Sequence, residues 1–224
     1  MTQEQQIAVR VQKVKKNRIR MKLFFFAALA VLLLLATIFA KQLCPYDPYA
    51  QDLAQAMQPP SAAHLMGTDT YGRDMFSRVL IGAQTSISST FALVAIITLF
   101  GTAVGVICGY HGGRVDAFVM RISDICLAFP GLVFAMAVAA ILNGGVQNAV
   151  IALALISWPK YSRIARSQTL SIKELPYIHA SKLAGDTTTQ VVFRHVLPNI
   201  VGPILVTAML DIGTMMMEIA GLSF

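Results

Sequence analysis

Charged residues are scarce in this chain. Only 13% of its 224 residues are charged, whereas 56% are hydrophobic. A soluble domain of ordinary composition carries about a quarter charged residues. The low charge and high apolar content together predict that a lipid bilayer surrounds most of the chain.

The positive charges do not form a polar binding face. Seven of the eighteen lysines and arginines lie between Arg10 and Lys22, directly before an apolar run, and six more lie between Lys160 and Arg194. Basic clusters beside apolar segments are typical of the cytoplasmic flanks of membrane spans. A nucleic-acid-binding face would need a soluble core behind it. The pattern predicts a cytoplasmic amino terminus and excludes nucleic acid as a partner.

Cysteine and histidine are too few and too scattered to indicate a site. The three cysteines form no CxxC pair and no even set, which argues against a disulfide framework and a zinc site. No two histidines have the spacing of metal ligands on a helix. The four are His64, His111, His179 and His195. We predict no metal site.

The chain also lacks the residues of an enzyme. Gly67 and Gly72 have the spacing of a phosphate-binding loop, but Arg73 and Asp74 follow where a lysine and a hydroxyl residue are required. No clustered nucleophile and base is visible at membrane depth. We therefore predict a protein without catalytic activity and without a cofactor of its own.

Five segments are long and apolar enough to cross a bilayer, which takes about 20 residues. The first is too long for a secretory signal and has no cleavage site after it. Gly101 and Gly105, four apart in the second, either allow a close helix contact or reflect the ordinary glycine content of membrane helices. Pro130 predicts a kink in the third. The segments are 23–40, 86–110, 117–142, 146–163 and 199–224.

These segments divide the chain into four parts. They are a basic cytoplasmic segment (1–22), a first transmembrane helix (23–43), an extracytoplasmic loop (44–84) and a transmembrane core (85–224). The loop holds four aspartates and two basic residues, which agrees with an outer location. Five crossings put the carboxyl terminus outside, with Phe224 still in apolar surroundings, so we expect an incomplete bundle.

Residues 168–198 predict a helical hairpin on the cytoplasmic side of the core. A short helix stops at Gly185, a polar turn follows, and a second helix ends at Pro198. Small side chains at Ala180 and Ser181 would let the hairpin seat in a groove of a partner.

This hairpin resembles the coupling loop of permease subunits of bacterial ABC importers. The loop of that family reads Glu-Ala-Ala, three residues, Gly, and later Leu-Pro. Four positions match and two depart, because a histidine replaces the glutamate and a serine replaces the second alanine. In order, the corresponding residues are His179, Ala180, Ser181, Gly185, Leu197 and Pro198.

The outer loop carries a second, more specific resemblance. The stretch Gly67-Thr-Asp-Thr-Tyr-Gly-Arg-Asp-Met-Phe-Ser-Arg78, preceded by Pro45-Tyr-Asp-Pro48, is similar to the signature of the peptide/nickel branch of these permeases. The resemblance implies an all-α, polytopic transmembrane bundle of the ABC importer permease type, with six spans of which five are present. It also implies a multi-pass location in the bacterial plasma membrane.

The resemblance further implies the partners. They are a second permease subunit in a heterodimer, two cytoplasmic ATPase subunits that bind the ATP, an extracytoplasmic solute-binding protein and the lipid bilayer. The last span looks more like nickel permeases than dipeptide permeases. We therefore expect nickel or a metal chelate as cargo, with dipeptides or oligopeptides as the alternative.

The last predicted span carries two acidic residues. Asp211 and Glu218 are seven apart, with Met215 between them, so a helix places all three on one face. Acidic side chains at membrane depth usually face an interior or an aqueous path. The three predict a substrate pathway suited to cationic cargo. Alternatively, Asp211 bonds a neighbouring helix and Met215 fills space.

Arg121 and Asp124, three apart at the start of the third span, predict a structural ion pair on one helix face.

A different class of function also remains open, namely a standalone ion channel or secondary transporter. Such proteins usually show inverted repeats around a midplane site, and no inverted repeat is visible here.

Overall fold

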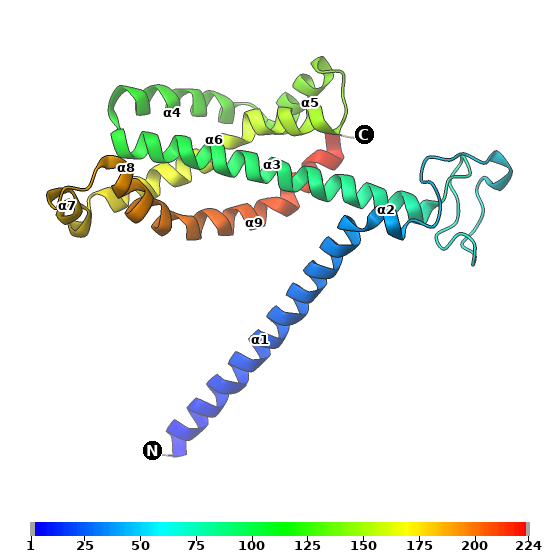
Figure 1. Cartoon of the computed structure of the whole chain (residues 1–224), viewed down its shortest axis with the longest axis horizontal. Coiled ribbons are helices and arrows are strands. Elements are labelled where there is room, and N and C mark those ends of the chain that lie inside the picture. The colour runs from blue at the N-terminus through cyan, green and yellow to red at the C-terminus, as the bar shows by residue number, and fades with distance from the viewer. Residues whose placement is uncertain (1–2, 223–224) are drawn as a thin grey trace. The chain divides into compact units, whose positions relative to one another are not determined.

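The computed structural model describes residues 3–222, and all regular structure within that range is helical. The chain divides into two compact units, residues 1–85 and 86–224. Helix α3, Met75–His111, begins in the first unit and continues into the second (Figure 1).

The first unit begins with a single long helix. Helix α1 runs from Gln3 to Ile38 and therefore includes the basic segment assigned to a cytoplasmic tail. Its part Ile19–Ile38 is apolar enough to cross a membrane. Helix α2, Ala40–Leu43, follows after a break at Phe39, so the predicted first transmembrane helix is interrupted near its end.

The outer loop of the first unit folds around a buried His64–Asp74 pair. The Nδ1 of His64 lies 3.0 Å from the carboxylate of Asp74, and its Nε2 lies 2.9 Å from the Oε1 of Gln55. Asp74 also accepts from the backbone N–H of Ser77 at 2.8 Å, as an N-cap residue does. This cap starts α3 at Met75, within the segment 44–84 that was assigned to the loop. The loop also contains a short 3₁₀ turn, Leu53–Gln55, and an isolated antiparallel β-bridge between Thr68 and Asp74.

Two glycines of the outer-loop motif are required by close backbone contacts. Both have positive φ, +73° at Gly67 and +70° at Gly72, a conformation that glycine adopts at little cost. A Cβ at Gly72 would lie 1.7 Å from the carbonyl oxygen of Asp52, and one at Gly67 would lie 2.4 Å from that of Gln58. The motif that resembles a phosphate-binding loop is thus a folding element of the outer loop.

Asp69 of the same motif makes the outer loop sensitive to acid. Its carboxylate accepts from the backbone N–H of Tyr71 and Arg73 and from the side chains of Arg73 and Arg78. Burial raises the pKa of Asp69, but these hydrogen bonds and the Arg73 charge outweigh it and lower the pKa from 3.8 to about 2. A carboxylate whose pKa is lower in the folded state than in the unfolded state stabilises the fold at any pH above its unfolded-state pKa. This stabilisation is lost as the pH falls through the folded-state pKa.

We expect hydrogen-exchange protection of residues 52–74 to persist down to about pH 4 and to be lost as the pH approaches 2. The Asp69→Asn variant should show weakened protection already at neutral pH. Protection of the unaltered loop that ends well above pH 4 would contradict this role for Asp69.

The second unit is a helical core. Helix α3 is followed by α4 (Gly113–Ala128), α5 (Gly131–Ile141), α6 (Val146–Lys173), α7 (Pro176–Leu183), α8 (Thr188–Val191) and α9 (Leu197–Leu222). The long helix α6 contacts α4, α5 and α9. Buried apolar side chains from α3, α5, α6 and α9 form one cluster around it.

Helix α3 packs against α6 through a row of three glycines. A Cβ at Gly101 would lie 2.6 Å from the carbonyl oxygen of Trp158, one at Gly105 2.3 Å from that of Ser162, and one at Gly109 2.8 Å from that of Arg166. Because the opposing atoms are backbone, no side-chain movement can make room. The close contact predicted from Gly101 and Gly105 is confirmed, and it extends by one more turn to Gly109.

The third predicted span is broken rather than kinked. Helices α4 and α5 meet at Phe129 and Pro130 with a bend of 91°. Proline has no N–H to donate and restricts the residue before it, and here both Phe129 and Pro130 have extended backbone. The predicted single helix over 117–142 is therefore wrong.

Three helical segments of the described chain are long and apolar enough to cross a membrane, and the bent α4–α5 pair makes up to four. They are Ile19–Ile38, Met75–His111 and Thr188–Leu222. Helix α6 is not among them, because Lys160, Arg163 and Arg166 follow its apolar first half. A polytopic helical bundle is confirmed, and the crossing by α6 stays a prediction.

Candidate functional site

The predicted coupling segment forms an exposed hairpin at one end of the core. Helix α7, with Pro176 in its first turn, buries Ile178 and leaves His179 and Ala180 exposed. Leu183, at the end of α7, is 89% exposed. Figure 1 shows α7 and α8 at one end of the core helices and the α5–α6 turn at the other.

Gly185 stops α7 as predicted. Its φ is +100°, and a Cβ there would meet no atom within 4 Å, so the backbone conformation alone demands glycine. Thr187 then caps α8 through a capping box with Gln190. The hairpin geometry therefore depends on local sequence signals.

Pro198 does not end the second helix of the hairpin, and that prediction is wrong. Helix α8 passes through a π-helical turn, Val192–Val196, directly into α9. The wider turn and the position of Pro198 in the first turn of α9 accommodate the missing N–H. Leu197 and Pro198 therefore belong to α9, whereas the other four predicted coupling residues belong to the hairpin.

Ser181, one of the departures from the family motif, joins α7 to the π-helical turn. Its hydroxyl donates to the carboxylate of Asp186 and lies 3.3 Å from the Nε2 of His195. These are the residue types of a hydrolase triad, but Asp186 lies 3.8 Å from Nε2, the same nitrogen that faces Ser181. A triad needs the carboxylate on the other ring nitrogen, so this cluster is structural.

The three predicted pathway residues line one cavity of about 340 Å³ between the α4–α5 break, α6 and α9. Asp211 and Met215 are buried, and Glu218 is half-buried. The shared face predicted from their spacing is therefore observed. Three further polar side chains line the same cavity, namely Ser157, Lys160 and Thr214.

Asp211 is fully engaged by α6, which sequence reasoning missed. Lys160 donates from its Nζ to one carboxylate oxygen at 2.6 Å, and Tyr161 donates from its hydroxyl to the other at 2.9 Å. The Asp211 side chain is only 5% exposed, whereas that of Lys160 is 49% exposed. The rule that an intramembrane carboxylate needs a partner could have prompted a search for Lys160.

The predicted Arg121–Asp124 pair is not formed. Asp124 instead receives a hydrogen bond from Arg163 of α6. One turn further along α6, Arg166 donates to both carboxylate oxygens of Asp116. Because α6 approaches the acidic face of α4, contacts between helices replace the contact within one helix.

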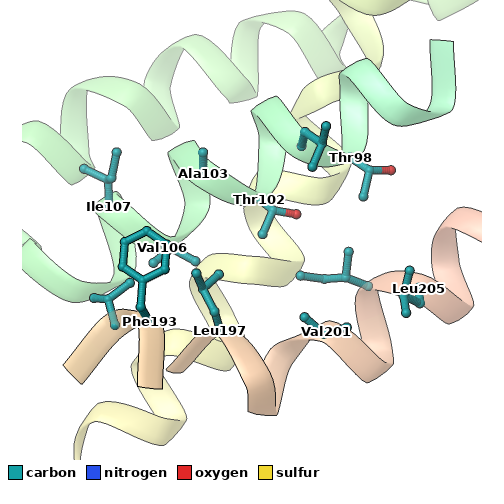
Figure 2. A pocket seen from close by; sticks show the side chains of 12 residues that line it. Thr98, Thr102, Ala103, Val106, Ile107, Phe193, Leu197, Val201 and Leu205 are labelled. Carbon is teal, nitrogen blue, oxygen red and sulfur yellow. The ribbon is translucent and has the colours of Figure 1, made fainter. Parts of the chain in front are cut away.

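A second hollow in the core has a different character. It measures about 520 Å³ and lies between α3 and the segment formed by the π-helical turn and α9. Figure 2 shows Thr98 and Thr102 on one side and Phe193, Leu197 and Val201 on the other. Among the described residues, its lining is apolar apart from the hydroxyl groups of Thr98 and Thr102.

Two family models match the chain. Residues 101–224 match the binding-protein-dependent transport system inner membrane component, and residues 12–60 match the N-terminal transmembrane domain of oligopeptide transport permease C.

Several relatives share much of the sequence. The chain is 44% identical over 198 residues to the probable D,D-dipeptide transport system permease protein DdpC of Escherichia coli (strain K12), with 88% of this chain and 66% of the relative covered. It is 40% identical over 200 residues to the glutathione transport system permease protein GsiD of Pectobacterium atrosepticum, with 88% of this chain and 66% of the relative covered.

The nickel transport system permease protein NikC of Escherichia coli (strain K12) is 35% identical, with 92% of this chain and 73% of the relative covered. The chain thus spans about two thirds of the length of DdpC and GsiD. Together with the helical core and its exposed hairpin, these matches show that the chain belongs to the family of binding-protein-dependent transport system inner membrane components, within its peptide and nickel permease branch.

Proposed function

We propose that this chain is a permease subunit of an ABC importer that moves short peptides into a bacterial cell with ATP hydrolysed by separate subunits. The observation that carries the proposal is the exposed α7–α8 hairpin, which lies within the segment 160–194 where six of the lysines and arginines gather. In this arrangement the amino terminus and the hairpin face the cytoplasm, as the basic clusters predict.

The proposed partners follow from what one subunit provides. The hairpin leaves His179, Ala180 and Leu183 exposed, which suits a groove on a cytoplasmic ATPase. The charged cavity has walls from α4, α5, α6 and α9 alone, so a second permease subunit would supply the remaining wall. Two ATPase subunits and an extracytoplasmic solute-binding protein would complete the importer, with ATPase closure shifting the permease pair between its open states.

A short peptide suits the cavity better than the metal cargo expected from the sequence. Lys160 and Tyr161 donate to the two oxygens of Asp211, so the ammonium group of Lys160 balances one of the two negative charges of the acidic stripe. The similarity to DdpC supports the same choice. The second candidate is nickel or a metal chelate, which is favoured by Met215 and Glu218 in the cavity wall and by the similarity to NikC.

Uptake by cells with and without the gene tests the cargo. Gene-dependent accumulation of a labelled dipeptide supports the proposal, whereas accumulation of nickel or its chelate alone replaces it with the second candidate.

Replacement of Gly185 by alanine should uncouple ATP hydrolysis from transport. The change strains the backbone at a φ of +100° without a steric clash, so the hairpin should shift while the core stays assembled. We expect cargo-stimulated ATPase activity and uptake in reconstituted importer to fall by roughly tenfold, the effect of about 1.4 kcal/mol.

The matched control is Gly144→Ala in the α5–α6 turn. Gly144 has a φ of +69° and equally open surroundings, but it lies at the other end of the core (Figure 1). Its substitution should leave coupling intact. Equal loss of coupling in both variants would count against the hairpin as the ATPase contact.

A further inference from the structure

We infer that the charged cavity recognises both ends of a zwitterionic peptide, with Glu218 binding the ammonium group and Lys160 binding the carboxylate. The inference rests on the proposed function, because it assigns a recognition mode to the peptide cargo. It gives the cavity two binding groups of opposite charge, and it gives Asp211 a positioning role.

Lys160 retains the capacity to bind a carboxylate. Its ammonium group has three N–H donors, and one of them donates to Asp211 at 2.6 Å. Half of the side chain is exposed, and the residue lines the cavity. Both oxygens of Asp211 are engaged, because Tyr161 donates to the other one. The buried carboxylate therefore holds the Lys160 ammonium group at the cavity wall, with two donors left for cargo.

Glu218 supplies the opposite charge. It is half-buried in the same wall, and among residues 3–222 its carboxylate has no hydrogen-bond or ion-pair partner within bonding distance. A carboxylate at membrane depth is costly unless a cation or a water-filled space accompanies it. The ammonium group of a peptide would satisfy Glu218 through a charge-assisted hydrogen bond.

The spacing of the two groups suits a peptide of two or three residues. Asp211 and Glu218 are two helical turns apart, about 10 Å along the axis of α9 at roughly 1.5 Å per residue, and Lys160 is held at the Asp211 end. An extended peptide covers about 3.5 Å per residue. The cavity of about 340 Å³ is also within the range of small-molecule sites, about 300–1,000 Å³.

The same cavity is poorly suited to a bare metal cation. Any cation near Asp211 would also meet the ammonium group of Lys160. Among the described residues, no group of three or more His, Cys, Asp or Glu side chains could hold a metal ion. The chemistry of the wall thus favours a cargo that carries both charges.

The test measures binding of three labelled probes to the purified permease–ATPase complex without the solute-binding protein, whose own selectivity would otherwise interfere. The probes are dialanine, N-acetyl-dialanine and dialanine amide. The unaltered complex should bind dialanine roughly ten- to a hundredfold more tightly than either blocked probe, the effect of a charge-assisted hydrogen bond.

Two substitutions separate the ends of the peptide. Glu218→Gln should bring the affinities for dialanine and N-acetyl-dialanine together while the preference over the amide persists. Lys160→Gln should remove the preference over the amide while the preference for a free amine persists. Glu218→Asp keeps the charge and should keep the preference for a free amine, which a purely structural role of Glu218 would not require.

The outcomes distinguish the inference from the proposed function. If the complete importer accumulates dialanine but Glu218→Gln keeps the unaltered selectivity for a free amine, the inference is wrong and the peptide cargo stands. If the unaltered importer accumulates no dipeptide in reconstituted vesicles, the proposed cargo itself is wrong.

Discussion

Replacement of Gly105 by isoleucine is expected to prevent the core from assembling. The first side-chain carbon at this position would lie 2.3 Å from the carbonyl oxygen of Ser162 and 2.8 Å from the Cβ of Ala165. Because the nearest atom is backbone, α3 and α6 must move apart. Overpacking usually costs about 1–3 kcal/mol, and we expect a value at or above the upper end because two whole helices separate.

The expected result is a large fall in membrane level and in the thermal unfolding temperature of the purified importer. The matched control is Gly82→Ile on the same helix, where an added side chain would meet no atom within 4 Å. This control should accumulate normally, because isoleucine has a higher helix propensity than glycine. If Gly105→Ile accumulates and melts like the control, the α3–α6 contact is not as described.

The second large effect is expected from Lys160→Met. The change leaves the nearly buried carboxylate of Asp211 with only the hydroxyl of Tyr161. Removal of one partner of a buried ion pair typically costs about 3–5 kcal/mol. Because the side chain of Lys160 is half exposed, we expect a cost at the lower end, about 3 kcal/mol, measured as a loss of stability in detergent.

The double variant Lys160→Met with Asp211→Asn should recover much of that stability. The neutral amide removes the unpaired charge and still accepts a hydrogen bond from Tyr161. A double-mutant cycle over the four proteins gives the coupling energy of the pair directly. Additive losses in the cycle would mean that Lys160 and Asp211 do not interact.

Sequence reasoning found the parts of the molecule that local signals determine. Glycine at 185 predicted the stop of the first hairpin helix, since glycine adopts the positive φ that this stop requires. Gly101 and Gly105 predicted a close helix contact, because their spacing is a property of one helix. The spacing of Asp211, Met215 and Glu218 likewise put them on a common wall.

The errors arose where two segments distant in sequence meet. Asp124 has Arg121 three residues away on its own helix, but it pairs with Arg163, which α6 brings to the same face. Lys160 was counted with the cytoplasmic basic flank, whereas it is the partner of Asp211 across 51 positions of sequence. Pro130 predicted a kink in one helix, but the structure has two helices, α4 and α5, that meet at a bend of 91°. Beyond the bend, α5 packs against α6 and α9.

The sequence by itself therefore determined that the chain is helical and membrane-embedded, where the first helix of the hairpin stops, and which face of the last helix is acidic, because composition and periodicity act within one segment. Only the tertiary structure decided which groups that acidic face meets. The packing of α6 against α9 brings Lys160 and Tyr161 to Asp211, because segments far apart in sequence come together there, and it leaves Glu218 in the wall of the same cavity.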